Sequence, residues 1–229
     1  NQDTRHHSWN KFSKMKHLVL LLLAGAALAR VPQNTRAVQY TRVYTDQNMN
    51  GNYLDVDDYV SDLAAYSFDN IIDSTCVNGI WMFYENTDFN QDVGKVYWMH
   101  GIDLCGNFPA EYTDMFSSIR FAGDPLDLNS DSWTLYQGSY FTGDEFFGVQ
   151  DVADLENLDM RGSSFIITGT SAWTVYSGKS WTGDAICVYP NETDNGVNGQ
   201  SFTFSMWPEI PLFGAPDNTI RSIRKGCWE

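Results

Sequence analysis

The chain has 229 residues, of which 15% are aromatic, and a formal net charge of −15 at pH 7. Such an acidic protein repels nucleic acid and anionic lipid and attracts cations, so nucleic-acid binding is not expected. Because scattered carboxylates also serve solubility, the charge alone does not indicate a cation site, and the placement of particular acids has to do so.

The first 29 residues predict export. Residues 1–14 are expected to be upstream sequence without a structural role, and residues 15–29 combine a basic start with the apolar run Leu18–Ala29. A basic start, a short apolar core and a small-residue end are typical of a secretory signal, with cleavage expected after Ala29. The run is shorter than the roughly 20 residues that cross a bilayer. We therefore expect a secreted, extracellular protein without a membrane span. Loss of four Lys/Arg and one Asp with residues 1–29 would change the net charge from −15 to −18.

Four segments share a pattern built on a tyrosine. Trp, any residue, an apolar residue and Tyr occur at 81–84, 133–136 and 173–176, and 41–44 is a weaker copy. The fifth residue after each Tyr is bulky: Met49, Phe89, Phe141 and Trp181. Two positions further come Gly51, Gln91, Gly143 and Gly183. Alternating bulky residues predict a strand with one buried face, and the following stretch predicts a hairpin over which the aromatic folds, with an altered turn where Gln replaces Gly.

The spacing of the repeat predicts two domains. The tyrosines at 44, 84, 136 and 176 are separated by 40, 52 and 40 residues, so the four units form two pairs with a linker between them. The Gly-, Pro- and Asp-containing residues 123–130 supply that linker. We therefore expect an all-β protein with one domain at 38–122 and another at 131–227, each a β-sandwich of two units.

A hexapeptide that ends in Ser closes each unit. The four copies occupy 69–74, 113–118, 159–164 and 217–222, and an Asp stands first or second in each of them. The final Ser is expected to be structural and to bond the hairpin. Asp, Asn and Ser also favour turns through local bonds to the backbone, so a turn without a ligand is the alternative for any single hexapeptide.

The aromatic–glycine hairpins and the Ser-terminated hexapeptides together resemble the βγ-crystallin superfamily, and the resemblance covers residues 38–227. It implies two βγ-crystallin-like Greek-key β-sandwich domains with two motifs each. In that family, paired motifs bind calcium reciprocally. One motif gives the third-position carbonyl and the fifth-position side chain, and its partner gives the leading acid or amide. Such oxygen ligands suit Ca²⁺.

Carried over residue by residue, the resemblance implies about three calcium sites. In the first domain, one site uses Asp73, the Ile71 carbonyl and Asp114 from the partner motif. The other uses Ser117, the Met115 carbonyl and Asp69 or Asn70, and further candidates are the hairpin carbonyls of Thr45 and Glu85. In the second domain, one site uses Ser163, the Arg161 carbonyl and Asp217. The remaining set, with Asp159 in the leading position, has Arg221 in the fifth position. A guanidinium has no lone pair to offer a cation, so at most one site is expected there.

Four cysteines in an exported chain favour two disulfides, for which three pairings exist. We prefer the pairing that keeps each bridge inside one domain, Cys76 with Cys105 and Cys187 with Cys227. The sequon Asn191-Glu192-Thr193 makes Asn191 a candidate glycosylation site on the surface.

An enzyme is not expected. His100 is the only histidine after the predicted cleavage site, which excludes a multi-histidine zinc site and leaves one possible base for a nucleophile. The expected function is a non-enzymatic, calcium-binding structural protein. The alternative is a secreted recognition or defence module that binds a glycan or protein through the long loop of the fourth motif. The aromatics of residues 194–216, Phe202, Phe204, Trp207 and Phe213, could form that surface or a local core.

Overall fold

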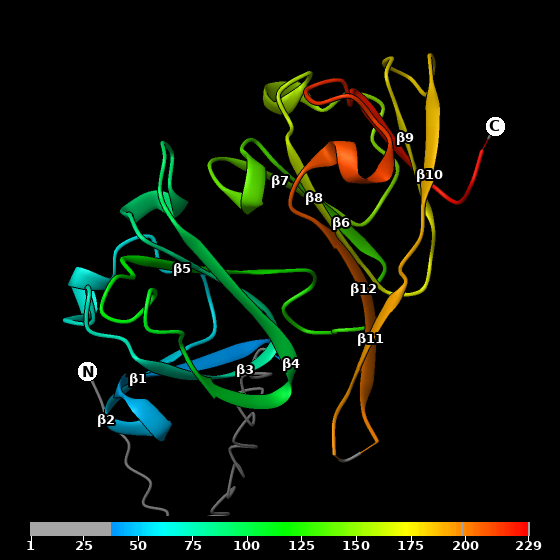
Figure 1. Ribbon diagram of the computed structural model, residues 1–229. Helices are drawn as coiled ribbons and strands as arrows, with labels where there is room; N and C mark the ends of the chain where they lie inside the picture. Colours follow the sequence, from blue (N-terminus) through cyan, green and yellow to red (C-terminus); the bar gives the residue numbers. More distant parts are fainter. Residues whose placement is uncertain (1–37, 198, 229) are drawn as a thin grey trace, which may run out of the picture. The chain divides into compact units, whose positions relative to one another are not determined.

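The computed structural model describes residues 38–197 and 199–228, so the predicted upstream sequence and signal peptide lie outside the described residues. In that part of the chain, the regular structure is β-strands and short 3₁₀ turns (Figure 1). The strands are β1 Tyr40–Asp46, β2 Asn50–Val56, β3 Ser74–Tyr84, β4 Val96–Asn107, β5 Ser118–Ala122, β6 Ser132–Tyr136, β7 Glu145–Gly148, β8 Ser164–Thr168, β9 Trp173–Tyr176, β10 Ala185–Val188, β11 Glu192–Asn195, β12 Ser201–Trp207 and β13 Ser222–Lys225. The 3₁₀ turns are Gln47–Met49, Leu63–Tyr66, Thr87–Phe89, Ser139–Phe141, Glu156–Leu158 and Ile210–Phe213. None of the described helices is long and apolar enough to cross a membrane.

The long strands β3 and β4 connect the layers of the first domain, whose strands pair in a single sheet. The order is β2-β1-β3-β4, and β5 also pairs with β3. The first part of β3 pairs with β1, and its second part pairs with β5. The register of β3 against β4 shifts between Val77 and Gly79, where Gly79 has a φ of 98°. A glycine tolerates this conformation, so the strand can bend there and continue from one motif into the next.

The second domain contains the same arrangement as two separate sheets. One has the order β10-β9-β13, and the other has the order β11-β12-β8-β6-β7. The strand β12 of the fourth motif pairs with β8 of the third, from Phe204 opposite Thr168 to Trp207 opposite Phe165. This exchange of a strand between paired motifs confirms the predicted Greek-key sandwich.

Each domain has its own hydrophobic core. The first centres on Trp81, Phe83 and Phe116, and the second on Trp133, Phe165 and Trp173, all of them fully buried. The Trp residues of the repeated pattern therefore supply the largest core side chains, as the period-2 alternation predicts.

A third apolar cluster joins the two domains. It combines Ile80, Met82, Tyr84, Val96 and Ala122 of the first domain with Tyr136, Phe141, Ile166, Phe202 and Phe204 of the second. The described residues belong to one compact unit, which agrees with this shared cluster. The cluster uses the faces of β3, β5, β6 and β8 that point away from the two domain cores.

A buried arginine lies beside this cluster. The Arg120 side chain is 1% exposed, and its guanidinium donates to the carbonyl oxygens of Phe141 and Gly143 at 2.7 and 2.9 Å and to the Tyr84 hydroxyl at 2.9 Å. Its Nη1 lies 3.5 Å from Oε2 of Glu145, whose Oε1 accepts a 2.6 Å hydrogen bond from the Tyr59 hydroxyl. First-domain donors thus meet second-domain acceptors at a largely buried position, where the Arg120 side chain is 1% and the Glu145 side chain 17% exposed. No sequence motif indicated this pair.

The long segment of the fourth motif is not the surface excursion that we expected. The strands β11 and β12 pair antiparallel, and β12 belongs to a five-stranded sheet. Phe202 and Phe204 are each 1% exposed in the cluster between the domains, and Trp207 and Phe213 pack against the second core. Of the two alternatives left open by the sequence, a core therefore applies to Phe202 and Phe204, because the first domain covers the face on which they lie.

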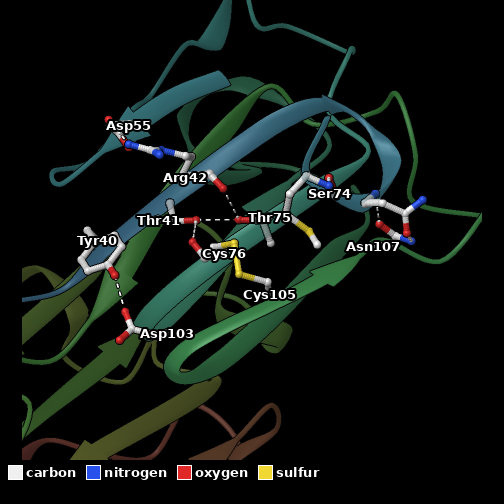
Figure 2. Close-up of a disulfide and its surroundings, with 12 residues drawn as sticks. Tyr40, Thr41, Arg42, Asp55, Ser74, Thr75, Cys76, Asp103, Cys105 and Asn107 are labelled. Carbon is white, nitrogen blue, oxygen red and sulfur yellow. Dashed lines mark hydrogen bonds and ion pairs between the residues drawn. A yellow bond between two sulfur atoms is a disulfide. The ribbon is translucent and has the colours of Figure 1, made fainter. Parts of the chain in front are cut away.

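Both predicted disulfides are present. Cys76 is bonded to Cys105 and Cys187 to Cys227, with Cα separations of 3.9 and 5.3 Å. Figure 2 shows the first, which joins the neighbouring strands β3 and β4. Each bridge stays within one domain, as the preferred pairing requires.

Candidate metal centre

The hairpins of the four motifs share one backbone geometry. Two successive residues have a positive φ of 51–63°: Asn48 and Met49, Asp88 and Phe89, Tyr140 and Phe141, and Ser180 and Trp181. This left-handed conformation is unfavourable for residues other than glycine, so tertiary contacts have to maintain it. The second residue of each pair is the repeated bulky residue. In the second hairpin Asn90 is also left-handed, which is the altered turn expected where Gln91 replaces glycine.

The final Ser of each hexapeptide maintains this geometry. Ser74, Ser118, Ser164 and Ser222 each accept a hydrogen bond from the backbone N–H of the repeated bulky residue, at 2.9–3.1 Å. Each hydroxyl also donates to a hairpin carbonyl at 2.6 Å. The structural role predicted for these serines is confirmed.

Substitution of Ser118 by Ala is expected to destabilise the first domain by about 1–3 kcal/mol, because the partly buried N–H of Phe89 loses its acceptor. Denaturant unfolding measures this change. Ser61→Ala, at an exposed position, is the control and is expected to stay within about 0.5 kcal/mol of the parent protein. An equal effect of the two substitutions would contradict the structural role.

Backbone hydrogen bonds place the hexapeptides of paired motifs side by side. The N–H of the fifth residue donates to the carbonyl of the repeated Tyr in all four motifs, from Asp73 to Tyr44, Ser117 to Tyr84, Ser163 to Tyr136 and Arg221 to Tyr176. The second residue of each hexapeptide donates to the fourth residue of its partner: Asn70 to Phe116, Asp114 to Ile72, Met160 to Ile220 and Asn218 to Gly162. The leading residues of one motif therefore lie against the fifth residue of the other, as a reciprocal site requires.

The carboxylates of Asp114 and Asp46 act electrostatically on Asp73. The Asp73 Oδ1 atom is buried and has no hydrogen-bond partner. The pKa of Asp73 is raised above its usual value by burial, and further by the negative charges of Asp114 and Asp46. A buried oxygen that lacks a donor and feels the negative charges of two further acids is a group that a cation would satisfy. Asp46 was not among the residues predicted from the sequence, because it belongs to the hairpin rather than to a hexapeptide.

The second predicted site brings Ser117 and Asp69 together. The Ser117 hydroxyl, which is largely buried, donates a 2.6 Å hydrogen bond to Oδ1 of Asp69 from the partner motif. Oδ2 of Asp69 accepts from the Asn70 side chain at 3.0 Å. The fifth-position side chain and the leading acid thus meet across the two motifs, and both can turn an oxygen lone pair toward an ion.

In the second domain, Ser163 is buried and lies in the same backbone arrangement. The Asp217 carboxylate is exposed and accepts a 2.8 Å hydrogen bond from its neighbour Asn218. The carboxylate and the Ser163 hydroxyl are not joined by a hydrogen bond in the described residues, so this pair is a less complete version of Ser117 and Asp69.

At the fourth candidate site, where Arg221 stands in the fifth position of its hexapeptide, cationic side chains of the protein occupy the place of a metal ion. Nε and Nη2 of Arg221 both donate to the Asp159 carboxylate at 2.8 Å, and Lys179 Nζ lies 3.2 Å from it. The Arg221 hydrogen bonds, with a contribution from Lys179, lower the pKa of Asp159 to about 2. Arg221 and Asp159 occupy the positions that Ser117 and Asp69 occupy in the first domain. A guanidinium therefore lies where the resemblance would have a cation.

No cluster of three or more His, Cys, Asp or Glu side chains in the described residues is close enough to hold a metal ion by side chains alone. The donor set implied by the resemblance instead combines one or two side chains with backbone carbonyls, which is a usual ligand set for Ca²⁺. The first-domain residues fit such a set. The candidate hairpin carbonyls of Thr45 and Glu85 lie next to these residues in the chain. The Tyr44 carbonyl accepts from the Asp73 N–H and the Tyr84 carbonyl accepts from the Ser117 N–H, and Thr45 and Glu85 directly follow the two tyrosines.

Comparison with known proteins agrees with this geometry. No protein-family model and no curated protein matches the sequence. Among solved structures, Geodin, a βγ-crystallin from Geodia cydonium, matches with a TM-score of 0.62 and 15% identity over 82% of this chain and 99% of its own. βγ-Crystallins from Ciona intestinalis and from an archaeon match at TM-scores of 0.34 and 0.35, with 18% and 21% identity, over 41% and 42% of this chain and 98% and 99% of their own. Only the first similarity is strong enough to support the fold of the whole described chain. The resemblance seen in the motifs is thus confirmed at the level of the fold, and the chain is a two-domain protein with the βγ-crystallin fold.

Proposed function

We propose that this protein is a secreted, non-enzymatic structural protein that binds calcium, with two sites in the first domain and at most one in the second. The observation that carries the proposal is the buried, unpartnered Asp73 Oδ1 atom beside Asp114 and Asp46. A carboxylate in this environment is unfavourable without a cation and becomes a strong ligand with one. The Ser117–Asp69 contact supports the second site.

Isothermal titration of the purified protein with calcium tests the proposal. We expect two or three bound ions per chain, and one fewer in each of the variants Asp73→Ala and Ser117→Ala. Asp114→Ala is expected to weaken the Asp73 site, because the ligands come from both motifs. Asp57→Ala removes an equally negative but exposed side chain and is expected to leave the stoichiometry unchanged. Magnesium binding equal to calcium binding, or an unchanged number of bound calcium ions in both Asp73→Ala and Ser117→Ala, would refute the proposal.

A gain of binding is expected in the second domain when its own cations are removed. Arg221→Ser supplies a hydroxyl in the fifth position, and a second change, Lys179→Thr, removes the ammonium group near Asp159. The double variant is expected to bind one more calcium ion than the parent in the same titration. Arg224→Ser, which removes a positive charge of the neighbouring strand, is the control. An unchanged ion count in the double variant would show that the Asp159 backbone surroundings cannot complete a site.

Asn191 is proposed as a glycosylation site. Its residue is exposed, and its Oδ1 accepts a 2.5 Å hydrogen bond from Ser205, so the carboxamide is held by its oxygen. Secretion from eukaryotic cells is expected to yield a glycan-bearing peptide that contains Asn191. Mass spectrometry before and after enzymatic deglycosylation measures it, with Asn191→Gln as the control. An unmodified peptide from the secreted protein would contradict the assignment.

A further inference from the structure

The disulfide of the first domain is open to solvent. Cys76 of β3 lies directly opposite Cys105 of β4, and Cys105 is exposed whereas Cys76 is partly exposed (Figure 2). A cavity of about 320 Å³ borders the bridge, lined by Tyr40, Arg42, Tyr44, Asp55 and Asp103. A small thiol can therefore reach the sulfur of Cys105. The other bridge is similar in this respect, with Cys187 partly exposed and Cys227 exposed, but it lies in the second domain.

The first bridge is directly connected to the Asp73 site. Two residues beyond Cys105, Asn107 pairs with Ser74, the neighbour of Asp73. The next residue, Phe108, donates its N–H to the Asp73 carbonyl at 2.9 Å. Oδ1 of Asn107 accepts a 2.6 Å hydrogen bond from Asn48 N in the first hairpin. The chain then continues to Asp114, the ligand that the second motif would contribute. The end of β4 thus holds the two motifs together at this site.

The bridge joins β3 to a part of β4 whose residues are largely exposed. Beyond the irregularity at Val77–Gly79, β4 is paired with β3 only from Leu104 opposite Val77 to Asn107 opposite Ser74. Residues 103–105 and 107 are exposed. Exposed residues at the end of a strand are typical of a segment that opens locally, and a covalent cross-link between the strands opposes such opening.

We propose that the Cys76–Cys105 disulfide controls the calcium affinity of the Asp73 site, with a small dithiol as the reductant; the inference rests on the proposed calcium function. A thiolate of the dithiol attacks Cys105 Sγ, the S–S bond breaks, and Cys76 leaves as a thiolate that takes a proton from water. The second thiol of the reductant then attacks the mixed disulfide and releases the Cys105 thiolate. Two electrons pass to the protein, and the reductant becomes a disulfide.

The coupling has to act in both directions. If reduction loosens the 104–107 segment and weakens calcium binding by some factor, bound calcium makes reduction of this bridge less favourable by the same factor. We expect a factor of about five or more, the lower end of the usual range for coupled sites. The Ser117 site, whose residues the bridge does not adjoin, is expected to change less than the Asp73 site.

The test measures both directions on the complete protein. Calcium titration of oxidised and dithiothreitol-treated protein is expected to show about fivefold or greater weakening of one first-domain site after reduction. In the reverse experiment, the oxidised protein is equilibrated at a fixed dithiol-to-disulfide ratio with calcium or with a chelator. Free thiols are then alkylated and mapped by mass spectrometry. Calcium is expected to lower the reduced fraction of Cys76–Cys105 and to leave that of Cys187–Cys227 unchanged.

Matched variants separate the two bridges. Cys76→Ser/Cys105→Ser is expected to lose calcium affinity in the same way, whereas Cys187→Ser/Cys227→Ser is expected to retain it, with circular dichroism to check the fold of each. If Cys76→Ser/Cys105→Ser does not fold, the equilibration of the folded, oxidised parent with dithiol in calcium or in chelator still tests the inference. Equal calcium affinity in both redox states, or equal protection of both bridges, would overturn the inference alone. Absence of calcium binding in the oxidised parent would overturn it together with the proposed function.

Discussion

Replacement of Arg120 by Met is expected to lower the free energy of unfolding by about 3–5 kcal/mol, the usual cost of removing one partner of a buried ion pair. The change leaves Glu145 without a cation and removes the donor to the carbonyls of Phe141 and Gly143. Burial already raises the pKa of Glu145, and the positive charge of Arg120 opposes that rise. Urea unfolding, followed by tryptophan fluorescence and circular dichroism, measures the loss.

The second partner provides an internal check. Glu145→Gln is expected to cost less than Arg120→Met, because the guanidinium keeps two carbonyls and the Tyr84 hydroxyl as acceptors. The double variant is expected to recover part of the loss, since no buried charge remains. Arg42→Met serves as the control: Arg42 makes an exposed ion pair with Asp55, worth about 0–1 kcal/mol. A loss from Arg120→Met as small as that of Arg42→Met would refute the importance of the buried pair.

Asp73→Asn is expected to have opposite effects on stability with and without calcium. Calcium that binds only the folded protein stabilises it by about 2.7 kcal/mol per site at a hundredfold excess over Kd, and the variant is expected to lose this gain for one site. Without calcium, the variant is expected to be more stable than the parent, because it removes a buried charge that Asp114 and Asp46 repel. Thermal unfolding in calcium and in chelator measures both effects.

The pH dependence follows from the direction of the pKa shift. Because the pKa of Asp73 is higher in the folded than in the unfolded state, protonation of Asp73 favours folding. This contribution is complete below the unfolded pKa of about 3.9 and is lost as the pH rises through the folded value. In chelator, the advantage of Asp73→Asn over the parent should therefore shrink as the pH falls toward 4. Asp57→Asn should show neither the opposite effects with and without calcium nor this dependence on pH. If the calcium gain of Asp73→Asn equals that of the parent, Asp73 is not a ligand.

The repeat made the fold predictable from the sequence. The strand–hairpin pattern depends on local features, namely the Trp and Tyr of each strand, the bulky residue of each hairpin and the Ser that bonds it. These features recur in register, so four weak motifs reinforce one another. The reciprocal contact between Ser117 and Asp69 followed from the same register and from the family resemblance.

The contacts between the domains could not be predicted in this way. Arg120 alternates with Ile119 and Phe121, so a period-2 pattern places it on the outer face of its strand, where a charged residue is ordinary. Only the second domain, packed on that face, makes the residue buried. Phe202 and Phe204 stayed open between a binding surface and a core for the same reason, since the sequence shows that they are apolar but not which surface covers them. Asp46 was missed because its approach to Asp73 depends on how the hairpin folds.

The shared apolar cluster between the domains has a consequence for a chain that is cut. Residues 126, 127 and 129 of the connecting segment are exposed, and exposed connections are preferred sites of proteolytic nicking. A cut there leaves Met82 and Ala122 packed against Ile166 and Phe204, and leaves Arg120 bonded to carbonyls on the other side of the cut. The two fragments would therefore remain associated as a non-covalent heterodimer. Either fragment produced alone would present a bare apolar face and would be prone to self-association.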